Sequence, residues 1–301
     1  MSIHGNEKIG VVLMTYGSAT TALHVREYFD AIYKGTAPEA LIADFENRYR
    51  LIGHSPLIEI TQRQSLLLEE RLGDAYVVRS GMRHSAPSIT DAVVACKAEG
   101  ATKMIGCILS PQFSSFIMEG YKTAFMSAVQ EAGIQNSVLV HPWPTEEHFV
   151  ELLAIRTTDA LEKIRTESGI DAPVIFTTHS MPKKIVENDA DYLKQLEATV
   201  DAVRRKLPSK LEWYAGYQSA GHTPEQWLKP DLTEILAGLD ARSVLIVPIQ
   251  FLADHLEILY DLDIAARKQC ESRGIAYNRI ELPNTHPLFI ETLATMVTNV
   301  A

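Results

Sequence analysis

Two side chains that can bind a metal and move a proton follow apolar runs in this chain. His179 comes directly after the run 172–178. Glu257 follows the run 243–249, in segment 251–261, which we expect to open a helix. Because the carboxyl ends of parallel strands meet at one edge of a sheet, we expect both side chains in one crevice. An imidazole with a carboxylate suits Fe, Zn, Co or Ni better than Mg or Ca, and two strong ligands hold a metal only loosely.

The same residues also have structural interpretations, which the local sequence leaves open. Asp254 and Glu257 have the D-x-x-E spacing of a helix capping box, and His179 can bond to backbone at a strand end. Asp261 lies one helical turn beyond Glu257, where two like charges repel each other unless a cation offsets them. Tyr16, which precedes a turn glycine, is either a β-favouring aromatic or a ligand for haem-type iron.

The composition narrows the class of protein. With 301 residues and 46% hydrophobic content, the chain is long enough for two domains. Its formal charge of −10 argues against non-specific nucleic-acid binding. The three cysteines form no C-x-x-C pair, which argues against a disulfide framework or a thiolate cluster. No apolar stretch reaches the roughly 20 residues that span a bilayer, and residues 1–8 lack the features of a signal peptide, so we expect a cytoplasmic protein without a transmembrane segment.

Short apolar runs rich in β-favouring residues alternate with helical patterns along the whole chain. The expected strands are residues 9–14, 75–80, 103–109, 136–140, 174–178, 212–217, 244–249 and 275–280. Apolar periodicity at 86–99 and 146–166 indicates helices between them. This alternation is typical of βαβ units, so the expected fold is α/β, with two similar Rossmann-like lobes whose parallel sheets are flanked by helices.

Short internal echoes indicate that the two lobes are related by duplication. The echoes are 108–113 with 247–251, and 13–18 with 176–180. They place Tyr16 and His179 at corresponding strand ends, which in such folds face the ligand crevice. Two prolines beside Trp143 break regular structure. We therefore expect an N-terminal lobe at 1–143 and a C-terminal lobe at 144–301, with the last helix packed back on the first lobe and an active cleft between the lobes.

A set of motifs spread over nearly the whole chain resembles the ferrochelatases in order and spacing. The motifs are Val11-Val-Leu-Met-Thr-Tyr-Gly17, Ser55-Pro-Leu57, Leu109-Ser-Pro-Gln-Phe-Ser-Ser115, Thr178-His-Ser-Met-Pro182, Gly216-Tyr-Gln-Ser219, Thr223-Pro-Glu-Gln-Trp-Leu228 and Phe251-Leu-Ala-Asp-His-Leu-Glu257. The Tyr-Gly after the first strand resembles the coproporphyrin ferrochelatases of Gram-positive bacteria more than the protoporphyrin enzymes.

This resemblance implies an enzyme of haem biosynthesis that inserts Fe²⁺ into a porphyrin, with coproporphyrin III as substrate and coprohaem as product. His179 and Glu257 match the family's iron-binding and proton-accepting pair, and Asp261 matches the next member of the acidic line that leads outward from the metal. Tyr16 matches the residue that approaches the metal from the opposite face of the macrocycle. The remaining positions that hold the porphyrin and its propionates are matched by Arg48, Tyr49, Ser55 and Tyr121.

The resemblance also implies partners for this protein, and the sequence departs from the family pattern at three places. It implies a monomer whose partners are the porphyrin, Fe²⁺ and a downstream enzyme that accepts coprohaem, with no cofactor beyond substrate iron and no [2Fe–2S] cluster. Tyr33 stands where close relatives place an arginine near a propionate. The turn 53–55 is one residue shorter than usual, and Ala265 replaces a further glutamate of the acidic helix.

Other functions stay open on the sequence alone. The same set of residues also suits a ferrochelatase that acts on protoporphyrin IX. A cobalt or nickel chelatase acting on sirohydrochlorin has a similar fold, with a metal site that is richer in histidine. In a porphyrin or haem carrier without turnover, Tyr16 would be an axial ligand and Glu257 only a helix cap.

Overall fold

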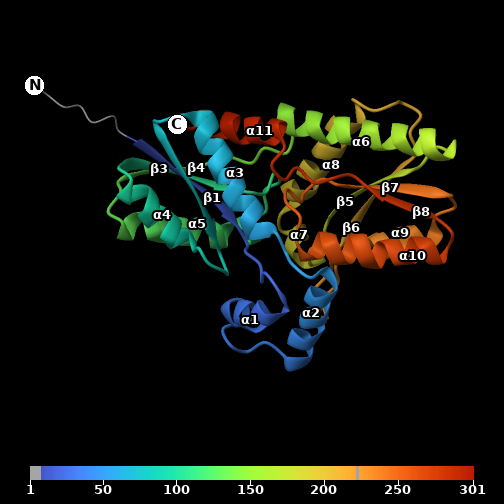
Figure 1. Cartoon of the computed structure of the whole chain (residues 1–301), viewed down its shortest axis with the longest axis horizontal. Coiled ribbons are helices and arrows are strands. Elements are labelled where there is room, and N and C mark those ends of the chain that lie inside the picture. Colours follow the sequence, from blue (N-terminus) through green and yellow to red (C-terminus); the bar gives the residue numbers. More distant parts are fainter. Residues whose placement is uncertain (1–7, 222–223) are drawn as a thin grey trace, which may run out of the picture.

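Eight strands form two parallel sheets in the computed structural model, which describes residues 8–221 and 224–301. The first sheet contains β1 (Lys8–Thr15), β2 (Tyr76–Met82), β3 (Ala101–Ile108) and β4 (Asn136–Leu139). The second contains β5 (Val174–His179), β6 (Trp213–Gln218), β7 (Ser243–Pro248) and β8 (Ala276–Arg279). All eight predicted strands are confirmed to within two residues, and so is the two-lobed α/β class (Figure 1). Thr223 of the predicted motif lies outside the described residues, as do residues 1–7.

The two sheets share one strand order, which explains the internal echoes of the sequence. The order is β2-β1-β3-β4 in the first sheet and β6-β5-β7-β8 in the second. Strand β1 therefore corresponds to β5, and β3 corresponds to β7. Tyr16 directly follows β1 and His179 ends β5, so the predicted correspondence between these two positions is confirmed.

Helices cover both sheets, and the two predicted helices are present. The helices are α1 (Val25–Tyr33), α2 (Glu39–Ile52), α3 (Leu57–Leu72), α4 (Ile89–Ala98), α5 (Ser115–Glu131), α6 (Glu147–Ser168), α7 (Lys183–Glu187), α8 (Ala190–Arg204), α9 (Leu232–Gly238), α10 (Arg267–Ser272) and α11 (Pro287–Thr298). Helix α4 begins later than predicted because Ser88 and Asp91 form a capping box at its start. Within the described part of the chain, no helix combines the length and the apolar character that a membrane crossing requires.

One buried core runs through both halves of the molecule. Val11 and Ile105 of the first sheet belong to the same apolar cluster as Phe176 and Val247 of the second, together with Phe289 of α11. Helix α11 packs against α3 of the first half and α6 of the second (Figure 1). This shared packing holds the two sheets in a fixed relation. The lobe boundary, which we placed between β4 and α6, stays a prediction.

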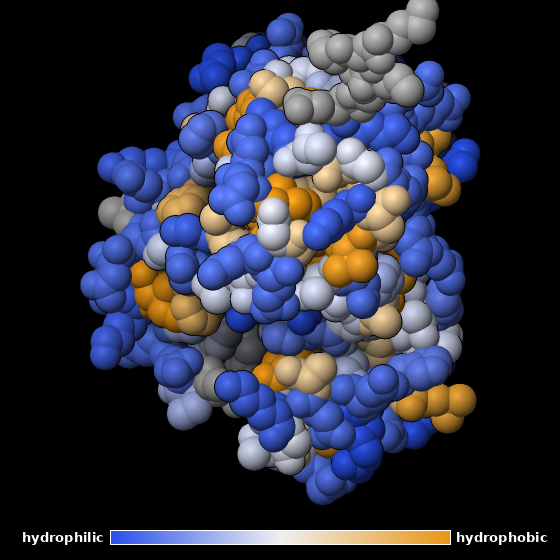
Figure 2. Space-filling model, turned by 90° about the vertical axis from the view of Figure 1, so that its left-hand side faces the viewer, coloured by the Kyte–Doolittle hydropathy of each residue, from blue (hydrophilic) through white to orange (hydrophobic). Residues whose placement is uncertain are grey.

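An arm formed by residues 22–52 lies outside the two sheets. It consists of the 3₁₀ turn Ala22–His24 with α1 and α2, at the bottom of Figure 1. Phe29 and Tyr49 of the arm pack against Leu256 of the second half, so the arm is attached through apolar contacts. Figure 2 shows a hollow between this lower part and the rest of the molecule, with hydrophobic side chains at its rim.

The helix that carries Glu257 and Asp261 differs from the predicted one. Residues 251–255 are irregular, and the residues Glu257–Ala266 form a π-helix, which continues into α10. The predicted helix start at residue 251 is therefore wrong by several residues. Asp254 has a different role from the expected cap: its carboxylate accepts a hydrogen bond from Asn284 (2.7 Å) and lies 3.6 Å from Arg279. π-Helical segments are rare and are frequently found at functional sites.

Candidate active site

His179 is held at the carboxyl end of β5 by contacts on both its backbone and its ring. Its backbone N–H donates to the side-chain oxygen of Gln250 (2.9 Å), and the amide nitrogen of Gln250 donates to the hydroxyl of Tyr192 (2.9 Å). The ring Nδ1 donates to the carbonyl of Ser180. This bond orients the ring so that Nε2 points to Glu257, at 3.4 Å from its Oε2.

Glu257 lies between two imidazoles. Its Oε2 is 3.4 Å from Nε2 of His179 and 3.9 Å from Nε2 of His255, whose Nδ1 donates to the carbonyl of Ala253 (2.9 Å). Oε2 is buried and accepts no hydrogen bond within residues 8–221 and 224–301. The capping interpretation of Glu257 is wrong, because no side chain caps the π-helix. The oxygen that faces both rings is therefore placed to stabilise a positive charge, either on an imidazole or on a bound cation.

The pKa values of this pair move in opposite directions for one electrostatic reason. Burial disfavours the charged imidazole, but the nearby carboxylate of Glu257 outweighs burial and raises the pKa of His179 to about 9. Burial alone would raise the pKa of Glu257, whereas attraction to His179 and His255 holds it well below its usual range. At neutral pH the free protein therefore carries an imidazolium and a carboxylate at this point.

Asp261 lies one turn further along the π-helix and completes a short acidic line. Ser219, at the end of the β6 segment with φ of 57°, donates its hydroxyl to Oδ2 of Asp261 (2.5 Å). Nη1 of Arg48 lies 3.6 Å from Oδ1. Burial raises the pKa of Asp261 to about 6, and the charge of Glu257 adds to this effect, against the Ser219 hydrogen bond and the charge of Arg48. The structure thus brings His179, Glu257, Asp261 and Arg48 together.

Tyr16 lies at the matching strand end of the first half, beside a cationic side chain. Its side chain is 41% exposed, and its ring centroid is 4.5 Å from that of His84. The Arg83 guanidinium lies over the rings of Tyr16 (5.9 Å) and Tyr121 (5.8 Å). Burial raises the pKa of the Tyr16 phenol, Arg83 opposes this, and the charge of Glu257 adds a smaller rise. Tyr16 is therefore a neutral phenol at neutral pH, within electrostatic reach of Glu257.

Three of the predicted porphyrin contacts are buried in this structure. Tyr49 and Ser55 are 2% and 1% exposed, and each hydroxyl lies 2.9 Å from the hydroxyl of Ser18. Tyr121 is buried under Arg83. The hydroxyls of Tyr49 and Ser55 therefore connect the end of the arm to Ser18, in the segment after β1. Direct contact of Tyr49, Ser55 and Tyr121 with a porphyrin stays a prediction.

The three departures from the family pattern involve Tyr33, Gly53 and Ala265, which are exposed at the surface. Tyr33 is half-exposed at the end of α1, where its ring stacks on that of Phe29 with centroids 5.6 Å apart. Gly53 ends α2 with φ of 76°, a conformation that favours glycine. Ala265 is exposed on the π-helix, so no carboxylate stands there beyond Asp261.

His255 is a functional candidate that the sequence prediction missed. Its signal was the Asp-His-Leu-Glu order within the predicted motif, but an imidazole two residues from a carboxylate does not normally face it on a helix. The irregular segment before the π-helix turns the ring back toward Glu257. Among the described residues, no three His, Cys, Asp or Glu side chains are grouped as a complete metal site.

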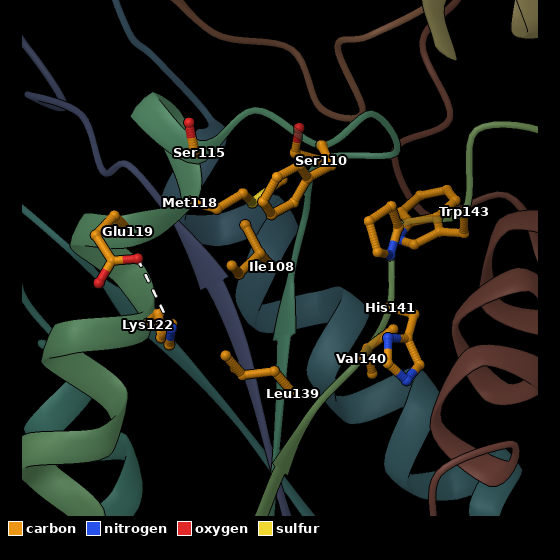
Figure 3. Close-up of a pocket in the computed structure, with 12 residues that line it drawn as sticks. Ile108, Ser110, Ser115, Met118, Glu119, Lys122, Leu139, Val140, His141 and Trp143 are labelled. Carbon is orange, nitrogen blue, oxygen red and sulfur yellow. Dashed lines mark ion pairs between the residues drawn. The ribbon is translucent and has the colours of Figure 1, made fainter. Parts of the chain in front are cut away.

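A separate cavity of about 250 Å³ lies between β3, β4 and α5, away from these residues. Its lining includes Ile108, Leu139 and Trp143, with Glu119 and Lys122 at one side (Figure 3). The last two form an ion pair of 3.8 Å along α5. None of the predicted site residues lines this cavity, so it is distinct from the candidate active site.

Comparison with known proteins assigns the family. The family model described as Ferrochelatase matches residues 8–301. The chain belongs to the ferrochelatase family. The coproporphyrin III ferrochelatase of Anoxybacillus flavithermus is 33% identical over 302 residues, which cover 97% of this chain and 96% of that protein. Those of Listeria innocua and Halalkalibacterium halodurans are 34% and 35% identical, with 97% of this chain covered and 97% and 96% of the respective relative.

Solved structures confirm the fold of this ferrochelatase family member. The cobalt complex of the sirohydrochlorin chelatase SirB from Bacillus subtilis superimposes with a TM-score of 0.62 at 13% identity, covering 98% of this chain and 95% of that chain. CbiX, named as the terminal enzyme of sirohaem biosynthesis in denitrifying bacteria, gives 0.58 at 9% identity, with 98% and 100% covered. At such low identity, these similarities establish a common two-lobed fold and no more.

Proposed function

We propose that this protein inserts Fe²⁺ into coproporphyrin III to form coprohaem in haem biosynthesis. The chain belongs to the ferrochelatase family, whose members insert a metal into a porphyrin, and its relatives named coproporphyrin III ferrochelatases match over nearly the whole length. The single structural observation that supports the chemistry is the buried carboxylate of Glu257 between two imidazoles, with one oxygen that accepts no hydrogen bond from the described residues.

The proton balance of the reaction fits this arrangement. Insertion replaces two pyrrole protons by Fe²⁺, so the site must accept protons close to the ring. His179, whose side chain is about one-third exposed, must first release its own proton to water before it binds a metal, because only neutral imidazole is a ligand. When iron passes from His179 into the macrocycle, the freed imidazole accepts a pyrrole proton, and Glu257 stabilises the imidazolium that results. His255 offers a second proton-accepting nitrogen 3.9 Å from the same carboxylate.

The weak ligand set suits a metal that must leave. Glu257, His179 and Asp261 offer imidazole and carboxylate ligands on the side of the second lobe, and a substrate metal held by few ligands can pass on to four ring nitrogens. We propose that Tyr16 faces the macrocycle from the other lobe. As a neutral phenol it is a poor ligand, so it does not hold iron back.

The test is iron insertion under anaerobic conditions. Purified protein is mixed with Fe²⁺ and either coproporphyrin III or protoporphyrin IX, and metalloporphyrin formation is followed by absorbance against a control without protein. Faster insertion into coproporphyrin III supports the proposal. Faster insertion into protoporphyrin IX would retain the chelatase and change its substrate. Tight porphyrin binding without insertion would favour the carrier, and insertion of cobalt or nickel into sirohydrochlorin alone would favour that chelatase.

Several expectations from the sequence stay predictions. These are the cytoplasmic location, the monomeric state, a downstream enzyme that accepts coprohaem, and activity without a resident cofactor or [2Fe–2S] cluster. Size-exclusion chromatography with light scattering measures the oligomeric state. Metal analysis of the purified protein measures whether any metal stays bound without porphyrin.

A further inference from the structure

Arg48 connects the arm to the acidic line of the π-helix. Its guanidinium lies 2.8 Å from Asp44, four residues earlier on α2, and 3.6 Å from Asp261 on the π-helix. The side chains of Arg48 and Asp261 are only 20% and 21% exposed, so solvent screens their attraction incompletely. The arm therefore places the positive charge of Arg48 beside Asp261, the last carboxylate of the acidic line.

The surroundings of Arg48 leave its ion pair with Asp261 weak enough for another carboxylate to replace Asp261. The guanidinium lies beside the rings of Phe45 (4.9 Å) and Tyr260 (5.1 Å), which support its plane without using its N–H groups. Its Nε is buried and has no hydrogen-bond partner within the described residues. The contact with Asp261 is longer than that with Asp44. A carboxylate that approaches Arg48 therefore meets a loosely held guanidinium, and movement of this side chain would give the buried Nε access to a partner.

We propose that Arg48 covers Asp261 in the free protein, and that a carboxylate of the porphyrin draws Arg48 away and makes Asp261 available to the metal. This inference rests on the proposed function, because it requires a porphyrin that carries carboxylates. Asp261 and the porphyrin then compete for one cation, and the porphyrin binds more weakly than it would to an uncovered Arg48. Metal binding at Asp261 follows porphyrin binding, which prevents the free protein from retaining iron at this position.

The competition is measured without metal, by porphyrin fluorescence on titration of coproporphyrin III. We expect Asp261→Asn to tighten binding about fivefold, the effect of losing a partly buried competing ion pair. Arg48→Met weakens binding. In the Arg48→Met background, Asp261→Asn has less than a twofold effect, because there is no longer a cation to release. The matched control is Glu46→Gln, which removes the partner of Arg50 on the same helix (2.9 Å) and leaves the affinity unchanged.

A second measurement tests the metal side of the same contact. Co²⁺ binding to the porphyrin-free protein is measured by calorimetry, and Arg48→Met is expected to tighten it about fivefold, whereas Arg50→Met does not change it. A porphyrin with only alkyl substituents binds wild type and Asp261→Asn equally, because it has no carboxylate to attract Arg48. Circular dichroism of each variant verifies the fold.

The outcomes separate this inference from the proposed function. Equal coproporphyrin affinity of wild type and Asp261→Asn would overturn the inference. It would also be overturned if Asp261→Asn increased the affinity just as much in the Arg48→Met background, since charge repulsion between Asp261 and the porphyrin would then explain the increase. Normal iron insertion in the wild type would leave the proposed function intact in both cases. If the wild type neither binds nor metallates coproporphyrin, the proposed function itself is wrong, and the inference falls with it.

Discussion

The substitution Glu257→Gln tests the central electrostatic argument. It removes the negative charge between His179 and His255 and keeps the shape of the side chain. The π-helix has no side-chain cap, so we expect the helix to persist in the variant. Iron insertion should fall by about two orders of magnitude or more, the usual contribution of a proton-accepting group in the transition state.

The effect on stability is worked from the pKa of His179, which is raised from 6.5 to about 9. This rise corresponds to about 3 kcal/mol of preference for the imidazolium, and solvent at a side chain that is one-third exposed reduces it to about 1–2 kcal/mol. A raised pKa gives stabilisation that is fully present below pH 6.5 and is lost as the pH rises through 9. Glu257→Gln should therefore be less stable than wild type at pH 6, and the difference should shrink toward pH 9.5.

Two assays measure these effects together. Urea unfolding at pH 6 and pH 9.5 gives the free energies, and anaerobic insertion into coproporphyrin III gives the rate. Glu271→Gln, at an exposed position of α10, is the matched control and should change neither. Unchanged iron insertion in Glu257→Gln would refute the catalytic role, and a loss of stability that is equal at both pH values would refute the electrostatic reasoning.

Two further substitutions test the surroundings of the site. Asp261→Asn should stabilise the protein by about 1–2 kcal/mol at pH 8, because burial raises the pKa of this carboxyl from 3.8 to about 6 and its charged form costs stability as the pH rises through 6. Urea unfolding should show a smaller gain in the free energy of unfolding at pH 5 than at pH 8. An equal gain at both pH values would contradict the raised pKa of Asp261. Gly81→Ala should destabilise by about 1–3 kcal/mol, because a Cβ there would lie 2.7 Å from the Cα of Ile89 on α4. Gly238→Ala is its control, since a Cβ added there would meet no residue from another part of the chain within 4 Å. If thermal unfolding ranked the two variants in the reverse order, β2 and α4 would not pack as described.

The strands could be predicted because their signal is local. A buried parallel strand is a continuous apolar run, and its neighbours in sequence are enough to define it. The internal echoes predicted two corresponding lobes, and the repeated strand order confirms this, since β1 and β5 occupy equal places in their sheets. For the same reason the meeting of His179 and Glu257 could be expected, and the two side chains lie 3.4 Å apart.

The start of the helix that carries Glu257 could not be predicted, because distant residues decide it. The D-x-x-E spacing favours a cap at Asp254. That carboxylate instead accepts a hydrogen bond from Asn284, which follows β8, and lies near Arg279, the last residue of β8. The competing partners lie about 25–30 residues further along the chain, and no local pattern contains them. The irregular segment that results, residues 251–255, in turn directs His255 toward Glu257.

By itself, the sequence determined the α/β fold with two similar lobes, the family, and the residue types at the two strand ends. Apolar runs, helical spacing and motif order are properties of short segments, and they persist whatever the rest of the chain does. Only the tertiary structure decided the charge state of these groups and the pairing of Arg48 on the arm with Asp261 on the π-helix. Burial and long-range contacts set those properties, because a pKa depends on the groups that packing brings within a few ångströms and on the solvent that packing excludes.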